Sequence, residues 1–345
     1  ARDNFKAVAI GGAKIGATVS IGGAVAWTEY TNTASASIGD ADVSGRTVAV
    51  DALAEVPDQI EVDDDFETIG SLTIPDFDFD TSSPGAFYES LDSFAIRIGQ
   101  ETEKLSVLTP YLSLTAGVPE KIATSFVAGS AEASGSNGFG ASGSFNVQKV
   151  TNTATASVGE GASVSATAGA VTVTANADVE TINIAGVPSV LALVKPASKS
   201  AGSSVGGTYG GITYDNTATA FIDDATSVTA ATDVTVRAHA DTFLVNLLEA
   251  GAQAAKLGLE GTFAWNQVNN RALAYIEETA TVTASAGDLL VEAENDVLAV
   301  TITGTIVKSN QVGVGASVAI NEFDSVTTAF IGDLNPSSVT AAGTI

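Results

Sequence analysis

The 345-residue chain has no cysteine, no methionine and a single histidine, His239. Disulfide bridges, zinc–thiolate sites and cysteine catalysis are therefore excluded. Aromatic residues make up only 6% of the chain although hydrophobic residues make up 45%, so small aliphatic side chains carry most of the apolar content. Such side chains suit thin, repetitive β-layers better than helices with leucine-rich faces.

Basic residues are scarce, because 14 Lys and Arg stand against 40 Asp and Glu and give a formal net charge of −26. This charge repels nucleic acids and anionic lipids, so we expect neither as a partner. Runs of about 18 uncharged apolar residues are also missing, so we expect no membrane insertion. The composition is typical of an exported bacterial protein, and we expect a secreted, extracellular or cell-surface location.

A seven-residue segment recurs five times along the chain. Its copies begin at Asn32, Asn152, Asn216, Asn270 and Ser325. The last two intervals are 54 and 55 residues (270 − 216 and 325 − 270), while the first, 120 residues, predicts a large insertion. Periods of this size are typical of repeats that bury their apolar sides against one another. We therefore predict an all-β, elongated β-solenoid, a parallel β-helix of tandem repeats of about 55 residues, right-handed by the usual crossover rule.

The repeats divide the predicted solenoid into consecutive units. Their bounds are 1–57, an acidic and partly helical insertion 58–124, then 125–185, 186–242, 243–298 and an incomplete 299–345, all in one continuous solenoid. Within the insertion, apolar residues over 86–108 follow a mostly helical spacing. Because the chain stops inside a strand-like stretch, we expect that it was excised from a longer array.

Large residues alternate with Gly, Ser and Thr in the stretch before each copy of the segment. This period of two indicates a strand with one face buried, and we predict that the large residues face inward. The predicted structural core is Trp27, Val147, Trp265, Ile320, Val25, Phe145, Tyr209, Phe263 and Val318. Stacking of the tryptophans on carbohydrate is a minor alternative.

Two sets of acidic residues are candidate calcium ligands. The first recurs eight positions after each segment start and consists of Asp40, Glu160, Asp224, Glu278 and Asp333. The second consists of Asp76, Asp78 and Asp80, which alternate with phenylalanines. Carboxylates gathered from turns suit Ca²⁺, but the simpler interpretation is that they are solvated and keep the edges soluble. We expect no obligatory cofactor.

Three stretches resemble a known family. They are Gly-Val-Gly-Ala-Ser-Val-Ala-Ile-Asn at 313–321, Asn-Thr-Ala-Thr-Ala-Phe-Ile at 216–222 and Asp-Val-Thr-Val-Arg-Ala at 233–238. They look like the repeats of giant bacterial surface proteins with haemagglutinin-like or adhesin-like β-strand repeats. The resemblance implies export, an elongated β-solenoid and an adhesive or scaffolding role. The Gly-Gly-x-Gly-x-Asp calcium nonapeptide does not occur, so a calcium roll is not implied.

Three functions remain to be compared. The leading hypothesis is a non-enzymatic structural segment of a filament or stalk protein, whose partners are further copies or repeats end to end. The alternative is an adhesin module that binds a cell-surface receptor or polysaccharide through residues 58–124. The third is a polysaccharide-degrading β-helix enzyme, which needs basic residues clustered beside carboxylates. Those are scattered here, and we expect His239 on an outward strand face with Arg237 and Asp241.

Overall fold

The computed structural model describes residues 7–14, 18–56, 125–133, 137–186, 198–332 and 338–344. These residues form β-strands and turns only, and every pairing between strands is parallel. The predicted all-β solenoid is thus confirmed. No helix suited to crossing a membrane occurs in the described part of the chain. The predicted insertion, with its helix over 86–108, lies outside the described residues.

The strands form three sheets, here named A, B and C. Sheet B contains β2 (Val19–Ile38), β6 (Phe139–Val158), β10 (Ser203–Ile222), β13 (Leu257–Ile276) and β16 (Val312–Ile331). Sheet C contains β3 (Asp42–Gly45), β7 (Ser163–Ala166), β11 (Ser227–Ala230), β14 (Thr281–Ala284) and β17 (Ser338–Ala341). Sheet A contains β1 (Ala7–Lys14), β4 (Val48–Val56), β5 (Ser125–Ala133), β8 (Val171–Gly186), β9 (Ser198–Ser200), β12 (Val234–Ala254) and β15 (Leu289–Ser309).

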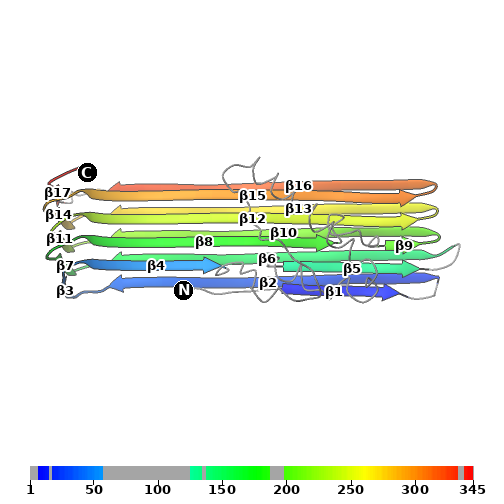
Figure 1. Ribbon diagram of the computed structural model, residues 1–345, viewed down its shortest axis with the longest axis horizontal. Coiled ribbons are helices and arrows are strands. Elements are labelled where there is room, and N and C mark those ends of the chain that lie inside the picture. Colours follow the sequence, from blue (N-terminus) through cyan, green and yellow to red (C-terminus); the bar gives the residue numbers. More distant parts are fainter. Residues whose placement is uncertain are drawn as a thin grey trace, which may run out of the picture.

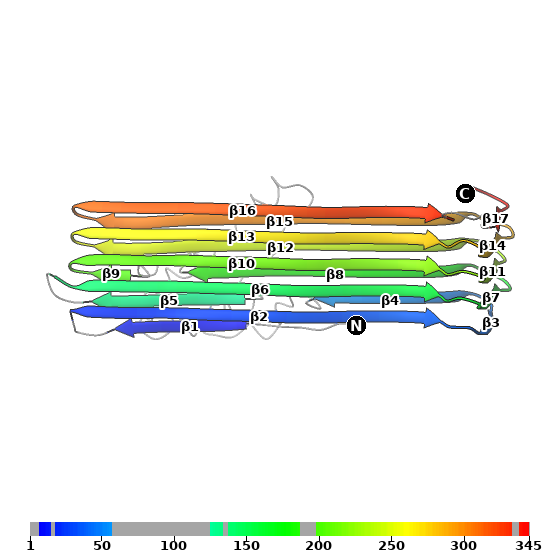
Figure 2. The same ribbon diagram turned by 180° about the vertical axis from the view of Figure 1, so that it is seen from behind.

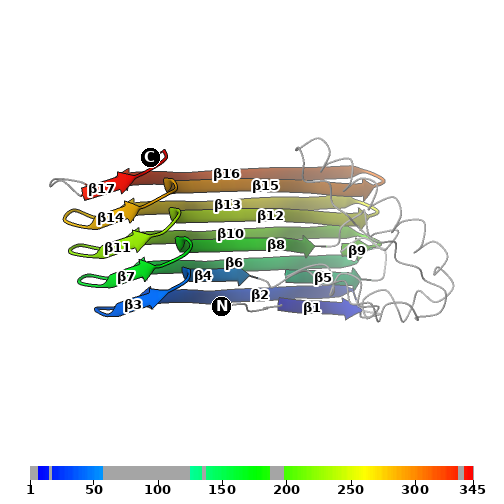
Figure 3. The same ribbon diagram turned by 60° about the vertical axis from the view of Figure 1, so that its left-hand side comes forward.

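Each coil of the solenoid follows the same path through the three sheets. The chain runs along sheet B, turns through the short strand in sheet C and returns along sheet A (Figure 3). In Figure 1 the sheet A strands run to the right in front, the sheet B strands run to the left behind them, and the chain rises from β2 to β16. Figure 2 shows the same path from behind. The coil is therefore right-handed, as predicted.

The register aligns the five copies of the repeated segment. Asn152 pairs with Asn32 on one side and Asn216 on the other, and Asn270 pairs with Asn216 and Ser325. The equivalence of the five segments is confirmed. Between sheets B and C, equivalent turn positions take a left-handed conformation, with φ of 77° at Gly161, 52° at Ala225 and 48° at Thr279.

The return strand of the first two coils is split. In the first coil β4 ends at Val56 and the strand resumes as β5 at Ser125, and in the second β8 ends at Gly186 and is followed by β9. Residues 243–254, for which helix or strand were both open from the sequence, belong to β12. Long chain segments can thus leave the solenoid in the middle of a return strand without disturbing the register of its neighbours.

The five coils form a flat slab, because the strands are long and the coils are few. A strand of 20 residues spans about 66 Å, whereas five coils rise about 24 Å along the solenoid axis. The longest dimension therefore lies along the strands (Figure 1). Near sheet C the core is a tightly packed cluster of alanine, valine and isoleucine side chains, and next to it lies a second cluster around Tyr214.

The predicted core residues lie on the outer face of sheet B, so that prediction was wrong. Trp27 is 69% exposed, Val25 67% and Trp265 44%. The other six are exposed or half-buried on the same face: Val147, Ile320, Phe145, Tyr209, Phe263 and Val318. The inward positions here are small because sheet A supplies the bulk. A Cβ on Gly210, for example, would lie 2.7 Å from Cδ2 of the buried Leu248.

Candidate functional site

An acidic cavity of about 580 Å³ lies on the outer face of sheet A. It is lined by Glu55, Thr174, Asn176, Asp178, Glu180, Arg237, His239 and Asp241. The register places the carboxylates of Glu55, Asp178, Asp241 and Asp296 in one row across four successive strands. Neighbours in such a row are about 4.8 Å apart along the solenoid axis, so four negative charges of the same row repel one another at close range.

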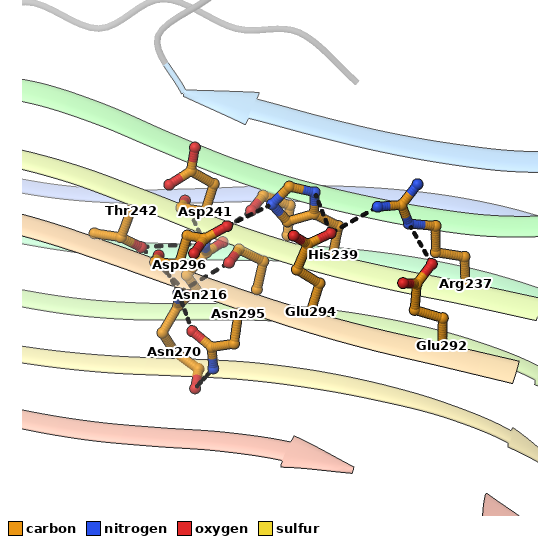
Figure 4. A network of polar contacts seen from close by, with 12 residues as sticks. Asn216, Arg237, His239, Asp241, Thr242, Asn270, Glu292, Glu294, Asn295 and Asp296 are labelled. Atoms are coloured by element: carbon orange, nitrogen blue, oxygen red, sulfur yellow. Dashed lines mark hydrogen bonds and ion pairs between the residues drawn. The ribbon is translucent and has the colours of Figure 1, made fainter. Parts of the chain in front are cut away.

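Two basic side chains of β12 face carboxylates of the next coil (Figure 4). Arg237 Nη2 lies 2.6 Å from Glu294 Oε2, and its Nε lies 3.3 Å from Glu292 Oε2. His239 Nε2 lies 3.7 Å from Asp296 Oδ2. The hydrogen bond from Arg237 lowers the pKa of Glu294. Since these side chains are partly exposed, each pair contributes about 1 kcal/mol or less.

The carboxylate row is hard to ionise completely. Burial raises the pKa of Asp178 to about 6, and the charges of Asp241 and Glu55 raise it further, while His239 opposes them. Burial also raises the pKa of Asp241, again opposed by His239. The cavity therefore gains negative charge as the pH rises through 6.

Replacing Asp178 by asparagine is expected to stabilise the protein at pH 7 by about 2 kcal/mol. The folded-state pKa of about 6 lies above the ordinary value of 3.8. The stabilisation that Asp178 gives when protonated is therefore complete below about pH 4 and is lost as the pH rises through 6. Urea unfolding between pH 4 and 8 would measure this, and Asp178→Asn should flatten the profile. Asn176→Ser, which changes a neutral lining residue, is the control; an unchanged slope in Asp178→Asn would contradict the assignment.

A ladder of asparagine amides crosses the interior next to the aliphatic cluster. Asn32, Asn152 and Asn216 are bonded in series, with Nδ2 to Oδ1 distances of 3.0 Å. Asn216 Nδ2 also lies 2.8 Å from the carbonyl oxygens of Ala177 and Asp241 in sheet A. The amides thus join successive coils and also join sheet B to sheet A, which satisfies polar groups that no water reaches.

A second buried amide chain lies nearer the opposite end of the slab. It alternates between the sheets: Asn146 donates to Asn183, which donates to Asn246 at 2.7 Å, which donates to Asn266 at 2.7 Å. Asn266 continues to Asn321 at 2.7 Å. All of these amides are committed to structural hydrogen bonds. They hold the register of the coils and leave little capacity to bind a ligand.

The outer face of sheet B carries a shallow apolar groove of about 750 Å³. Its floor is a column of small residues, here called the trough: Gly23, Gly143, Gly207, Gly261 and Ala316. Beside it stands a column of large residues, here called the ridge: Val25, Phe145, Tyr209, Phe263 and Val318. The ring of Tyr209 stacks on Phe145 at 4.7 Å and on Phe263 at 5.8 Å between centroids. Both columns run parallel to the solenoid axis.

The candidate calcium ligands in the turns do not form a site within the described residues. Asp40, Glu160, Asp224 and Glu278 occupy successive turns between sheets B and C. No group of three or more His, Asp or Glu side chains in the described part of the chain is arranged to hold a metal ion. Each turn offers one such carboxylate, whereas Ca²⁺ takes six to eight oxygens. Asp76, Asp78, Asp80 and Asp333 lie outside the described residues.

Sequence reasoning located some of these residues and missed others. The outward position of His239 beside Arg237 and Asp241 is confirmed. The asparagine ladders were missed, although a signal existed: Asn152 and Asn216 stand in phase with Ala154 and Ala218, which a strand puts on the same face. An asparagine recurring on an alanine face indicates an internal polar row.

Comparison of the chain with protein-family models, with curated proteins and with solved structures found no match. The class of molecule defined here is therefore a parallel β-solenoid with two chemically different outer faces. Its function has to be argued from that geometry.

Proposed function

We propose that this chain is a non-enzymatic, structural segment of a long extracellular or cell-surface filament or stalk. The observation that carries the proposal is the register: five strands of 20 residues pair over their whole length without a slip. Each coil therefore presents the next with the same surface that it received. In such a stack, length grows in proportion to the number of coils, and further repeats or copies can be added end to end.

The side chains favour the same role. Equivalent residues stack on one another, as Asn152 does on Asn216 and Tyr275 on Phe221, whose rings lie 5.0 Å apart. The net charge of −26 keeps neighbouring molecules apart in water. These features favour a durable, soluble spacer over a site of chemical turnover.

The charged cavity on sheet A does not favour the polysaccharide-degrading alternative. Such an enzyme needs basic side chains free to meet an anionic sugar beside a catalytic carboxylate. Arg237 and His239 instead face Glu294 and Asp296 of the next coil. The adhesin alternative through residues 58–124 remains a hypothesis, because those residues lie outside the described part of the chain.

Pulling the two ends of the chain apart in a single-molecule force experiment tests the proposed role. A stalk segment should yield coil by coil, because each coil contacts only its neighbours. A repeat of 54 residues, the interval from Asn216 to Asn270, releases about 190 Å of extended chain. We expect successive force peaks at that spacing. Release of the whole chain in one step, or extension at forces too low to give separate peaks, would overturn the proposal.

A further inference from the structure

The trough on sheet B is empty for a reason that lies outside the fold of one chain. A Cβ added at Gly23 or Gly207 would lie 3.4 Å from its nearest neighbour, and at Gly143 3.8 Å, which are ordinary contacts. Ala316 already occupies the same column in the fifth coil. Glycine in a strand weakens it, since the unfolded chain is more flexible and no side chain packs. The fold tolerates a side chain here, yet four coils omit it.

The ridge next to the trough is exposed and apolar. Val25 is 67% exposed, Val318 47% and Phe145 38%. Ridge and trough are two residues apart along each strand, which is about 6.6 Å. One further apolar column lies on each side of the pair: Ile21, Ala141, Val205, Leu259 and Val314 beside the trough, and Trp27, Val147, Gly211, Trp265 and Ile320 beside the ridge.

We propose that this face binds the same face of a second copy of the chain. The two copies would be related by a two-fold axis that runs parallel to the solenoid axis, midway between trough and ridge. That operation reverses the strand direction but leaves height along the solenoid unchanged. The ridge of each copy therefore enters the trough of the other at every coil. A two-fold axis along the strands would instead set ridge against ridge, where the rings collide.

The symmetry also pairs the flanking columns with each other. The column of Trp27 in one copy faces the column of Ile21 in the other, so four apolar columns form a closed, self-complementary set. Outside them, the next column contains Glu29 and Lys149, whose Oε1 and Nζ lie 2.9 Å apart, and forms a polar rim on one side. An apolar centre with a polar rim is the usual anatomy of a specific interface.

The area is adequate for a stable dimer. Four columns across five strands cover about 27 by 24 Å, or about 650 Å² per copy and about 1,300 Å² in total. This lies within the range of stable interfaces and exceeds the largest apolar patch of a typical monomer. The proposal is independent of the stalk function, since a single solenoid and a paired one both extend with coil number.

Sedimentation equilibrium of the full chain at micromolar concentration tests the pairing. The wild-type chain is expected at twice its mass of 34.5 kDa. A variant with Gly143→Val and Gly207→Val fills the trough and should dissociate at least tenfold more readily, with its β-sheet circular dichroism intact because valine favours strands. Gly304→Val is the matched control: Gly304 lies in β15 of sheet A, its Cβ would meet only Glu249 Cγ at 3.9 Å, and dimerisation should persist.

Cross-linking tests the geometry, because the chain has no cysteine of its own. One copy carries Gly143→Cys and the other Phe145→Cys, and a bismaleimide of about 10 Å matches the spacing of packed sheets. The mixture should cross-link several times more efficiently than either variant alone. A monomeric wild-type chain would overturn the proposal, and so would a trough-filled variant that still dimerises or a Phe145→Cys variant that cross-links best with itself. A wild-type monomer that binds phosphatidylcholine vesicles would assign the face to lipid and would equally overturn it.

Discussion

Replacing Asn216 by aspartate is expected to lower the free energy of unfolding by about 4 kcal/mol or more. The side chain is 0% exposed, and its Nδ2 lies 2.8 Å from the carbonyl oxygens of Ala177 and Asp241. Aspartate removes the donor, leaves two buried carbonyls unpaired and sets a carboxylate against them. Urea unfolding followed by circular dichroism would measure the loss.

Two further variants separate this cause from a general intolerance of substitution. Asn310→Asp introduces the same chemistry in the exposed turn between β15 and β16 and should change stability by less than about 0.5 kcal/mol. Asn216→Ser introduces the residue that the fifth coil has in this row, Ser325, and should cost an intermediate amount of about 1–3 kcal/mol. If Asn216→Asp cost no more than Asn310→Asp, the ladder would not hold the coils together.

Deleting one whole coil is expected to leave a folded protein. Removal of residues 223–276 joins Ile222 to Glu277, and because Ile222 pairs with Ile276 in register, the new junction keeps every row aligned. The shortened chain should unfold cooperatively, with a stability lower by about 3–8 kcal/mol, the share of 54 residues in a typical domain. Its longest dimension in small-angle scattering should not change, because that dimension lies along the strands.

Deleting half a coil is the matched control. Removal of residues 223–249 joins the end of β10 to Ala250, in the far half of β12, so the chain cannot close a turn of the solenoid. This variant should be insoluble or unfolded although it loses only half as many residues. Equal stability of the two deletions would contradict the view that the coil is the unit of folding.

The sequence was sufficient for the architecture because the repeats carry it. Once Asn152, Asn216 and Asn270 are aligned, parallel stacking follows, since equivalent residues of a solenoid lie side by side. The handedness followed from the general crossover rule. Both depend on spacing, which a single sequence displays directly.

The orientation of the sheet B face could not be derived from alternation alone. A period of two identifies two faces but does not say which one is buried. The size of the residues suggested that Trp27 and Phe145 face inward. The structure reverses this because Leu248 of the facing strand fills the space above Gly210, and such a contact between residues 38 positions apart (248 − 210) leaves no local trace in the sequence.

The acidic cavity depended on information of the same kind. Asp178 and Asp241 are 63 residues apart (241 − 178) and become neighbours only through the register of β8 and β12. The repeat predicts that pairing in principle. Its consequence for the pKa of Asp178 requires the burial of the site as well, which no spacing reveals.

The flat cross-section determines how a long array of these coils deforms. A slab about 66 Å wide and about 20 Å thick, two sheets with their outer side chains, flexes about tenfold more easily through its thin direction than edgewise, since bending rigidity in each plane scales with the square of the dimension in that plane for a fixed area. A long assembly would behave as a tape, compliant enough to follow a curved surface while resisting sideways deflection. Joining two such tapes face to face would double the thickness and remove much of that anisotropy, so that pairing itself would set the mechanical character of the assembly.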